Sequence, residues 1–221
     1  MRHLGAVSLA AALVVACVPA GEATVPYRMD DDVVVEIPAS YAVYDGDWAA
    51  FVDSATRQDL TPAERGYLEA LREQGPPLST AFVMAFRAGS QGDGGTEILF
   101  ITAGGLPIDW ASFPEEEWLA NGVPAGAQQA SVEFVSVAGS DAVLLRYFDP
   151  SAGMGGQQPA GSWVTMLQFN SGDRNYTISA TTSRPPSRAL DSILIGIAES
   201  VGPMGGDRES AVGGSTWAES A

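Results

Sequence analysis

Runs of consecutive apolar residues, set between turn signals, constrain the fold of this chain more than any other feature of its sequence. The clearest are Ile98-Leu99-Phe100-Ile101 and Val143-Leu144-Leu145, and short runs of this kind are typical of buried strands. Neighbouring residues of a strand point to opposite faces of the sheet, so a strand that is apolar at every position must be covered on both faces. The sequence therefore predicts a sheet with helices on each side.

The spacing of the turn signals indicates that this sheet is largely antiparallel. Seven strands are expected, at residues 33–37, 80–87, 96–102, 131–138, 142–149, 162–170 and 175–182. The last four form two hairpins, one across Gly139-Ser140-Asp141 and one across residues 171–174, and short turns of this kind connect antiparallel strands. The predicted fold class is α+β: an α/β/α sandwich on a largely antiparallel sheet of about seven strands, with helices on both faces.

Four helices are expected to cover the sheet, at residues 47–58, from Thr61 onward, near 114–121 and at about 187–201. Thr61, Pro62 and Glu64 have the spacing of a capping box. Ser112 and Glu115 repeat that spacing before the third helix. The last helix carries an apolar stripe whose members lie three and four residues apart: Leu190, Ile193, Leu194, Ile197 and Val201.

The order of these elements resembles a known fold. Ile37-Pro38 ends the first strand and Tyr41 and Val43 follow it; helices and a meander of strands come next. A strand of the Asn175–Ala180 type then leads into one closing helix. Over about residues 32–202 this order resembles the PsbP-like superfamily, which includes an extrinsic photosystem II subunit and bacterial envelope lipoproteins of the LpqN and DcrB types. The resemblance implies an accessory or binding role without catalysis, and it assigns no functional residues.

The inventory of side chains excludes most catalytic chemistry. The chain has no Lys, its 11 cationic residues are all Arg, and its single His is His3, in a segment that we expect to be removed. Catalysis by Ser-His-Asp or Cys-His, zinc bound by His, a P-loop lysine and Schiff-base chemistry are therefore excluded. No cofactor is expected. The net charge of −16 repels phosphate backbones, which excludes nucleic acid as a partner.

The N-terminus predicts export. A basic start is followed by the apolar run Leu4–Ala16, which has the length of a signal peptide and is short for a membrane span. Val14-Val15-Ala16-Cys17 resembles the bacterial lipobox, which implies a diacylglycerol on the sulfur of Cys17, the only cysteine, and cleavage before it. Two alternatives stay open: ordinary signal cleavage after Ala20 or Ala23, and an uncleaved anchor.

These features divide the chain into four parts. We expect a lipoprotein-type signal peptide at 1–16, a polar tether at 17–31, the folded domain at 32–202 and a disordered, Gly/Ser-rich tail at 203–221. The folded domain is then displayed outside the cytoplasm, anchored by its lipid to the outer face of the cell membrane.

A long connection, residues 103–130, holds the candidate ligand-binding residues Trp110, Phe113 and Trp118. An aspartate and three consecutive glutamates lie beside them. Long loops on a rigid sheet commonly bind ligands, and aromatic rings with nearby carboxylates suit a sugar or a cationic peptide. The alternative is that the rings anchor the short helix on the sheet while the glutamates face water.

Three functions stay open at this point. The favoured one is a lipid-anchored, non-catalytic accessory or binding lipoprotein of the bacterial cell envelope, whose partner is an envelope protein or an apolar ligand. The second is a carboxylate-dependent hydrolase of wall glycans, which needs only two acids, such as Asp45 with Asp47 or Asp109 with Glu115. The third is a secreted, soluble binding protein without a lipid anchor.

Overall fold

The computed structural model describes residues 22–29, 33–76, 82–89, 95–152 and 161–203. The predicted signal peptide, the lipobox with Cys17 and nearly all of the predicted tail lie outside these residues. Within the part of the chain that is described, no helix combines the length and the apolar character that crossing a bilayer requires.

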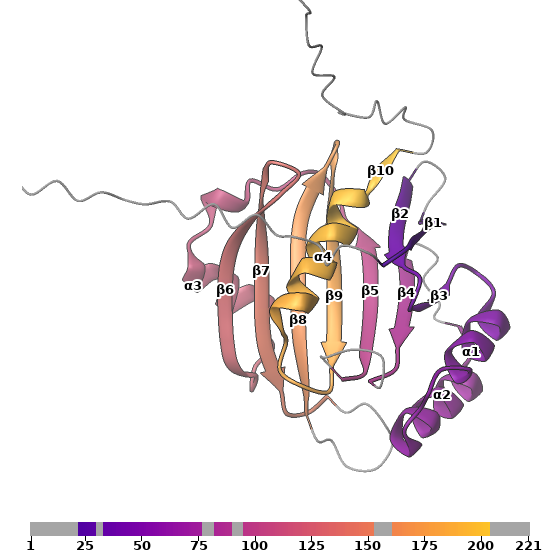
Figure 1. The fold of residues 1–221 in the computed structure, drawn as a ribbon. Helices are drawn as coiled ribbons and strands as arrows, with labels where there is room; N and C mark the ends of the chain where they lie inside the picture. Colours follow the sequence, from indigo (N-terminus) through magenta and orange to yellow (C-terminus); the bar gives the residue numbers. More distant parts are fainter. Residues whose placement is uncertain (1–21, 30–32, 77–81, 90–94, 153–160, 204–221) are drawn as a thin grey trace, which may run out of the picture.

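Seven strands form the main sheet, in the order β3-β4-β5-β9-β8-β7-β6 (Figure 1). Their bounds are β3 Ala42–Tyr44, β4 Phe82–Arg87, β5 Glu97–Ala103, β6 Gln128–Val137, β7 Ser140–Asp149, β8 Ser162–Ser171 and β9 Arg174–Thr182. Every pair of neighbours is antiparallel. The predicted antiparallel sheet is therefore confirmed, although its edge strand β3 was not among the strands expected from the sequence.

A second, three-stranded sheet holds β2 (Val33–Pro38) between β1 (Thr24–Arg28) and β10 (Gly202–Pro203). The strand expected at 33–37 exists, but it lies in this small sheet and not in the main one. The expected tether is also corrected, because part of it forms β1 and pairs antiparallel with β2. Backbone pairing accounts for both differences. β2 buries alternate side chains in the core, and it pairs with β1 on one side and with β10 on the other.

Four helices and a 3₁₀ turn accompany the strands in the described ranges: α1 (Trp48–Thr56), α2 (Pro62–Gln74), η1 (Trp110–Ser112), α3 (Glu115–Gly122) and α4 (Arg188–Ser200). The capping box of α2 is confirmed, because Thr61 Oγ1 accepts from the backbone N–H of Glu64 and Glu64 Oε2 accepts from that of Thr61. The capping box expected for α3 is wrong. The Ser112 hydroxyl already donates to the Asp109 carbonyl within η1, at 2.7 Å, and Pro114 takes the N-cap position.

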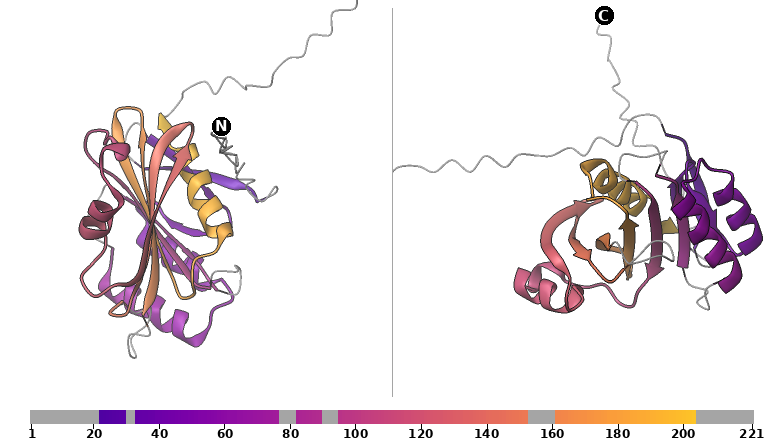
Figure 2. Two further views of the ribbon diagram at one scale, coloured as in Figure 1. Left: turned by 90° about the vertical axis from the view of Figure 1, so that its left-hand side faces the viewer. Right: turned by 90° about the horizontal axis from the view of Figure 1, so that it is seen from below.

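Helices cover both faces of the main sheet, as the two-sided apolar strands predicted. Figure 2 shows α4 on one side of the strands and α3 on the other. The first face packs against α4 and β2, while α1 with α2 and η1 with α3 cover two parts of the second face. The alternation is visible within β7: Leu144 belongs to the cluster beneath α4, and its neighbours Val143 and Leu145 pack with Trp110 on the opposite face.

The hairpin between β6 and β7 turns in two residues. Val137 pairs with Ser140, which leaves Ala138 and Gly139 in the turn with φ of 49° and 81°. Positive φ at both positions is what a type I′ turn requires, and its twist matches that of the strands. The predicted turn began at Gly139, one residue too late.

Candidate functional site

Two asparagines hold the connection that carries the candidate binding residues. Asn170, near the end of β8, donates from Nδ2 to the Ile108 carbonyl at 2.8 Å, and its Oδ1 accepts from the Ile108 N–H at 3.1 Å. Asn175, at the start of β9, donates from Nδ2 to the Leu106 carbonyl at 2.6 Å. A Cβ at position 104 would lie 1.8 Å from Asn175 Oδ1, so any side chain larger than that of glycine would displace the Asn175 amide that holds the loop. The loop is therefore fixed to the end of the sheet before the aromatic residues begin.

Trp110 lies underneath this connection and not on its surface. Only 2% of the residue is exposed, and its ring packs against Val143 and Leu145 of β7. Its Nε1 has no hydrogen-bond partner among the described residues, although buried indole N–H groups usually have one. Trp110 thus acts as an anchor of the connection on the sheet, and it reaches no ligand unless other residues move.

Phe113 and Trp118 lie nearer to the solvent and line a small hollow. Phe113 is 40% exposed and Trp118 is half-buried. Their ring centroids are 5.6 Å apart with the planes at 72°, and the centroids of the Trp118 and Trp110 rings are 5.5 Å apart. The hollow has a volume of about 180 Å³ and is completed by Ile108, Glu117 and Asn121. The structure therefore brings the three predicted residues together, with Phe113 and Trp118 at the surface.

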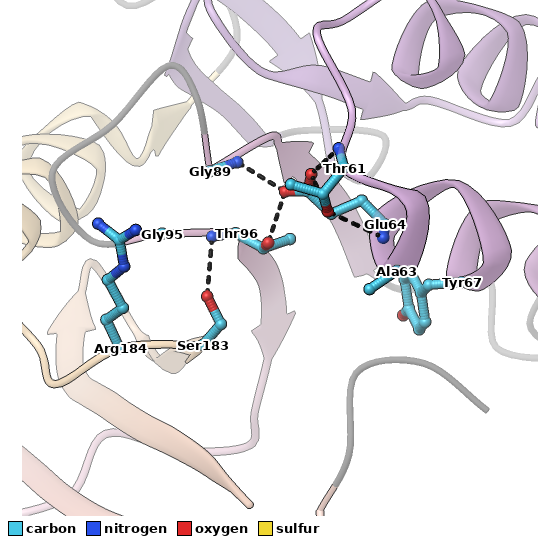
Figure 3. Close-up of a pocket in the computed structure, with 9 residues that line it drawn as sticks. All are labelled: Thr61, Ala63, Glu64, Tyr67, Gly89, Gly95, Thr96, Ser183 and Arg184. Carbon is cyan, nitrogen blue, oxygen red and sulfur yellow. Dashed lines mark hydrogen bonds between the residues drawn. The ribbon is translucent and has the colours of Figure 1, made fainter. Parts of the chain in front are cut away.

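A larger cleft, which the sequence analysis missed, lies between α2 and the end of the main sheet (Figure 3). Its volume is about 360 Å³, and its walls come from the start of α2, the facing ends of β4 and β5, and the residues that follow β9. Figure 3 shows Tyr67 on one wall and Ser183 with Arg184 on the other. Segments that are distant in sequence thus meet in one hollow.

Glu64 is the buried carboxylate of this cleft, and hydrogen bonds saturate it. Oε1 accepts from the Gly89 N–H at 2.7 Å and from Thr96 Oγ1 at 2.5 Å, while Oε2 accepts from the N–H and the hydroxyl of Thr61 at 2.7 and 2.8 Å. Burial by itself raises the pKa of Glu64, but the hydrogen bonds from Thr96, Gly89 and Thr61 outweigh it, and the pKa lies below its ordinary value. Glu64 therefore stays ionised at neutral pH, with no lone pair free to take a proton.

Three other groups of the cleft keep hydrogen-bonding capacity for a ligand. Burial raises the pKa of Tyr67 to about 12, so its hydroxyl remains a donor at neutral pH. Ser183 Oγ accepts from the Thr96 N–H at 3.1 Å, which leaves its own proton to donate. Arg184 is exposed, and its guanidinium forms no ion pair with any described residue. The cleft can therefore bind a group that accepts hydrogen bonds.

The acid pairs considered for hydrolysis are occupied or exposed. Asp47 is the N-cap of α1 and accepts from the Ala50 N–H at 3.0 Å. Asp45, Asp109 and Glu115 are exposed. Within the described ranges, no group of three or more His, Cys, Asp or Glu side chains is placed to hold a metal ion.

Local sequence signals could not have revealed the cleft. The capping box pointed to Thr61 and Glu64 as the start of a helix, but nothing indicated that this carboxylate also reaches Gly89 and Thr96. That contact depends on how α2 packs against the sheet. The approach of Ser183 depends on the register in which Glu97 of β5 pairs with Thr182 of β9.

The sequence of this chain matches no protein-family model and no curated protein.

Proposed function

We propose that this chain is a non-catalytic binding protein of the bacterial cell envelope, displayed outside the cytoplasm by a lipid on Cys17. The observation that carries the proposal is the cleft beside α2. Its buried carboxylate is saturated by four donors, and the groups that remain available are hydrogen-bond donors. Such a site binds an acceptor without a base to activate a nucleophile.

The cleft suits a ligand that carries a carboxylate or several hydroxyl groups. Arg184 supplies a fixed positive charge and a planar fork of donors, and the hydroxyls of Tyr67 and Ser183 add donors from two different walls. The resemblance to PsbP-like envelope lipoproteins supports the same kind of role, because it implies binding and not catalysis.

The position of β1 limits how far the domain can lie from the proposed lipid anchor. Six residues, 18–23, separate Cys17 from Thr24, the first residue of β1. An extended chain covers about 3.4 Å per residue, so six residues reach about 20 Å at most. With Cys17 acylated, the domain is held close to the bilayer surface by its β1 side.

The binding part is tested with full-length protein purified in an uncharged polyoxyethylene detergent. Saturation-transfer NMR is run against a panel of uronic acids, simple carboxylates and neutral saccharides. We expect a panel member to bind, and Arg184→Gln or Tyr67→Phe to abolish or weaken that binding. Arg188→Gln, which removes an exposed arginine that does not line the cleft, is the matched control. No binding by the panel, equal binding by Arg184→Gln, or turnover of a panel member would contradict the proposal.

The anchor is tested separately by metabolic labelling with a radioactive fatty acid. The wild-type chain should take up the label and fractionate with membranes, and Cys17→Ala should do neither. Label that persists in Cys17→Ala rules out lipidation at this residue, while an unlabelled chain found in the medium supports the soluble, secreted alternative.

A further inference from the structure

The hollow beside α3 has a chemistry different from that of the α2 cleft. Its lining residues Ile108, Phe113 and Trp118 are apolar, and only Glu117 and Asn121 add polar atoms. Its volume of about 180 Å³ is below the roughly 300–1,000 Å³ of pockets that enclose whole drug-sized ligands. The hollow therefore accepts one compact group and not an entire large molecule.

The two rings in its wall form a corner. The planes of Phe113 and Trp118 meet at 72° with centroids 5.6 Å apart, an edge-to-face arrangement, so a compact group in the angle between them contacts both rings. Aromatic faces carry partial negative charge and attract cations. The buried ring of Trp110 packs against Trp118, with their centroids 5.5 Å apart, and this contact holds Trp118 in place.

The charged side chains around the hollow also favour a positively charged ligand. Glu117 lines the hollow and is exposed, and among the described residues it has no ion-pair partner. Glu115 and Glu116 are exposed in the same helical turn. The chain as a whole carries a net charge of −16, which attracts cations and repels anions.

A sugar fits this hollow less well than a cation. Sugars stack on a flat aromatic platform and need several hydrogen-bonding partners, whereas here the rings meet at a steep angle and only two polar side chains are present. We infer that the hollow binds an organic cation, a substituted ammonium or guanidinium group, with the rings of Phe113 and Trp118 as its walls and Glu117 as its counter-charge. This site is independent of the α2 cleft.

The test uses the full-length protein in the same uncharged detergent and follows the indole N–H resonance of Trp118, identified by its loss in Trp118→Phe. The probes are tetramethylammonium chloride and methylguanidinium chloride, with sodium chloride at equal ionic strength and methyl glucoside as comparisons. We expect a saturable shift with at least one organic cation and none with sodium or the glucoside. A shift with tetramethylammonium alone indicates an ammonium site, and a shift with methylguanidinium alone indicates a guanidinium site.

Matched variants separate the site from general effects of charge and hydrophobicity. Phe113→Leu and Glu117→Gln should each weaken binding of the cation about two- to fivefold, the range typical of one exposed cation–π contact or one surface ion pair. Phe134→Leu, which changes an exposed aromatic elsewhere, should leave it unchanged, and Glu116→Gln, which changes a neighbouring carboxylate outside the hollow, should weaken it less than Glu117→Gln does. Equal shifts with sodium, a shift with the glucoside alone, or no difference between each variant and its control would overturn the inference. Arg184→Gln should not affect this site.

Discussion

Arg87 and Glu97 form a buried ion pair between adjacent strands of the main sheet. They are register partners on β4 and β5, and Arg87 Nη2 lies 2.8 and 2.7 Å from the two carboxylate oxygens of Glu97. Only 7% and 1% of the two residues are exposed. The Tyr41 hydroxyl also donates to Glu97, and the guanidinium lies 4.7 Å from the centroid of the Tyr41 ring.

Removing one partner of this pair should destabilise the protein more than removing both. Arg87→Leu or Glu97→Leu leaves an uncompensated buried charge, which costs about 3–5 kcal/mol. The double variant Arg87→Leu/Glu97→Leu leaves no buried charge, so its loss should be smaller than the loss in either single variant. Urea unfolding monitored by circular dichroism measures all four proteins; strictly additive losses would show that the pair contributes no coupling.

Glu64 should stabilise the fold through its ionised form. Glu64→Gln replaces one acceptor oxygen by a donor and leaves buried donors unpaired, which costs about 1–3 kcal/mol at neutral pH. Because hydrogen bonds lower the pKa of Glu64, its contribution is complete above the ordinary value of 4.5 and is lost as the pH falls through the folded-state pKa. The stability difference between wild type and Glu64→Gln should therefore shrink below about pH 4.5. Glu69→Gln, on an exposed position of α2, is the control and should show neither effect.

The tyrosines should make the fold sensitive to alkali. Burial raises the pKa of Tyr67 from 10.0 to about 12, so the unfolded chain loses this proton at a lower pH than the folded protein. Stability is complete below about pH 10 and decreases as the pH rises towards 12. In Tyr67→Phe, stability should fall less steeply as the pH rises. Part of the fall should remain, because burial also raises the pKa of Tyr41 and of Tyr147. Unfolding by guanidinium at several pH values between 9 and about 12 measures the slope; an unchanged slope in Tyr67→Phe would contradict the assignment.

Asn170 should control the order of the loop before Trp110. Asn170→Ala removes two hydrogen bonds to Ile108 and should cost about 1–2 kcal/mol. The Ile108 amide loses its acceptor, so its hydrogen exchange should accelerate while amides in the centre of β9 exchange as before. Asn121→Ala, at an exposed position of α3, should change neither. Unchanged exchange at Ile108 would mean that packing alone holds the loop.

If Cys17 carries the proposed lipid, its short link to β1 predicts which side of the domain faces the bilayer. A fluorophore on Ala39→Cys, next to the β1–β2 pair, should be quenched by acceptor lipids more strongly than one on Ala125→Cys, beside β6 at the far side of the sheet (Figure 1). Ten Gly/Ser residues inserted after Val18 should reduce the difference. Equal quenching at both positions of the acylated protein would show that the domain is not oriented by its link.

Local signals sufficed for the helices, for the longer strands and for the two-sided sheet, but not for the short strands β1, β3 and β10 or for the neighbours of each side chain. Apolar runs such as Val143–Leu145 indicate burial on both faces of the sheet, and the capping box of Thr61 with Glu64 indicates the start of a helix. Ser112 carries the same local signal but does not cap α3, because its hydroxyl donates to the Asp109 carbonyl in η1. The candidate binding residues Trp110, Phe113 and Trp118 lie near one another, and their role in binding stays a prediction. The burial of Trp110 depends on its contact with β7, more than thirty residues further along the chain.

By itself, the sequence determined the residue inventory, which lacks Lys and has its single His at position 3. It also determined those helices and strands that are specified by apolar patterns and by helix caps. These depend on residues a few positions apart, which is why they can be read locally. Only the tertiary structure decided that β2 leaves the main sheet, that Glu64 meets Gly89 and Thr96, and that Arg87 meets Glu97. Each of these contacts is made by strand register and helix packing, which are set by the free energy of the whole core and not by any one segment.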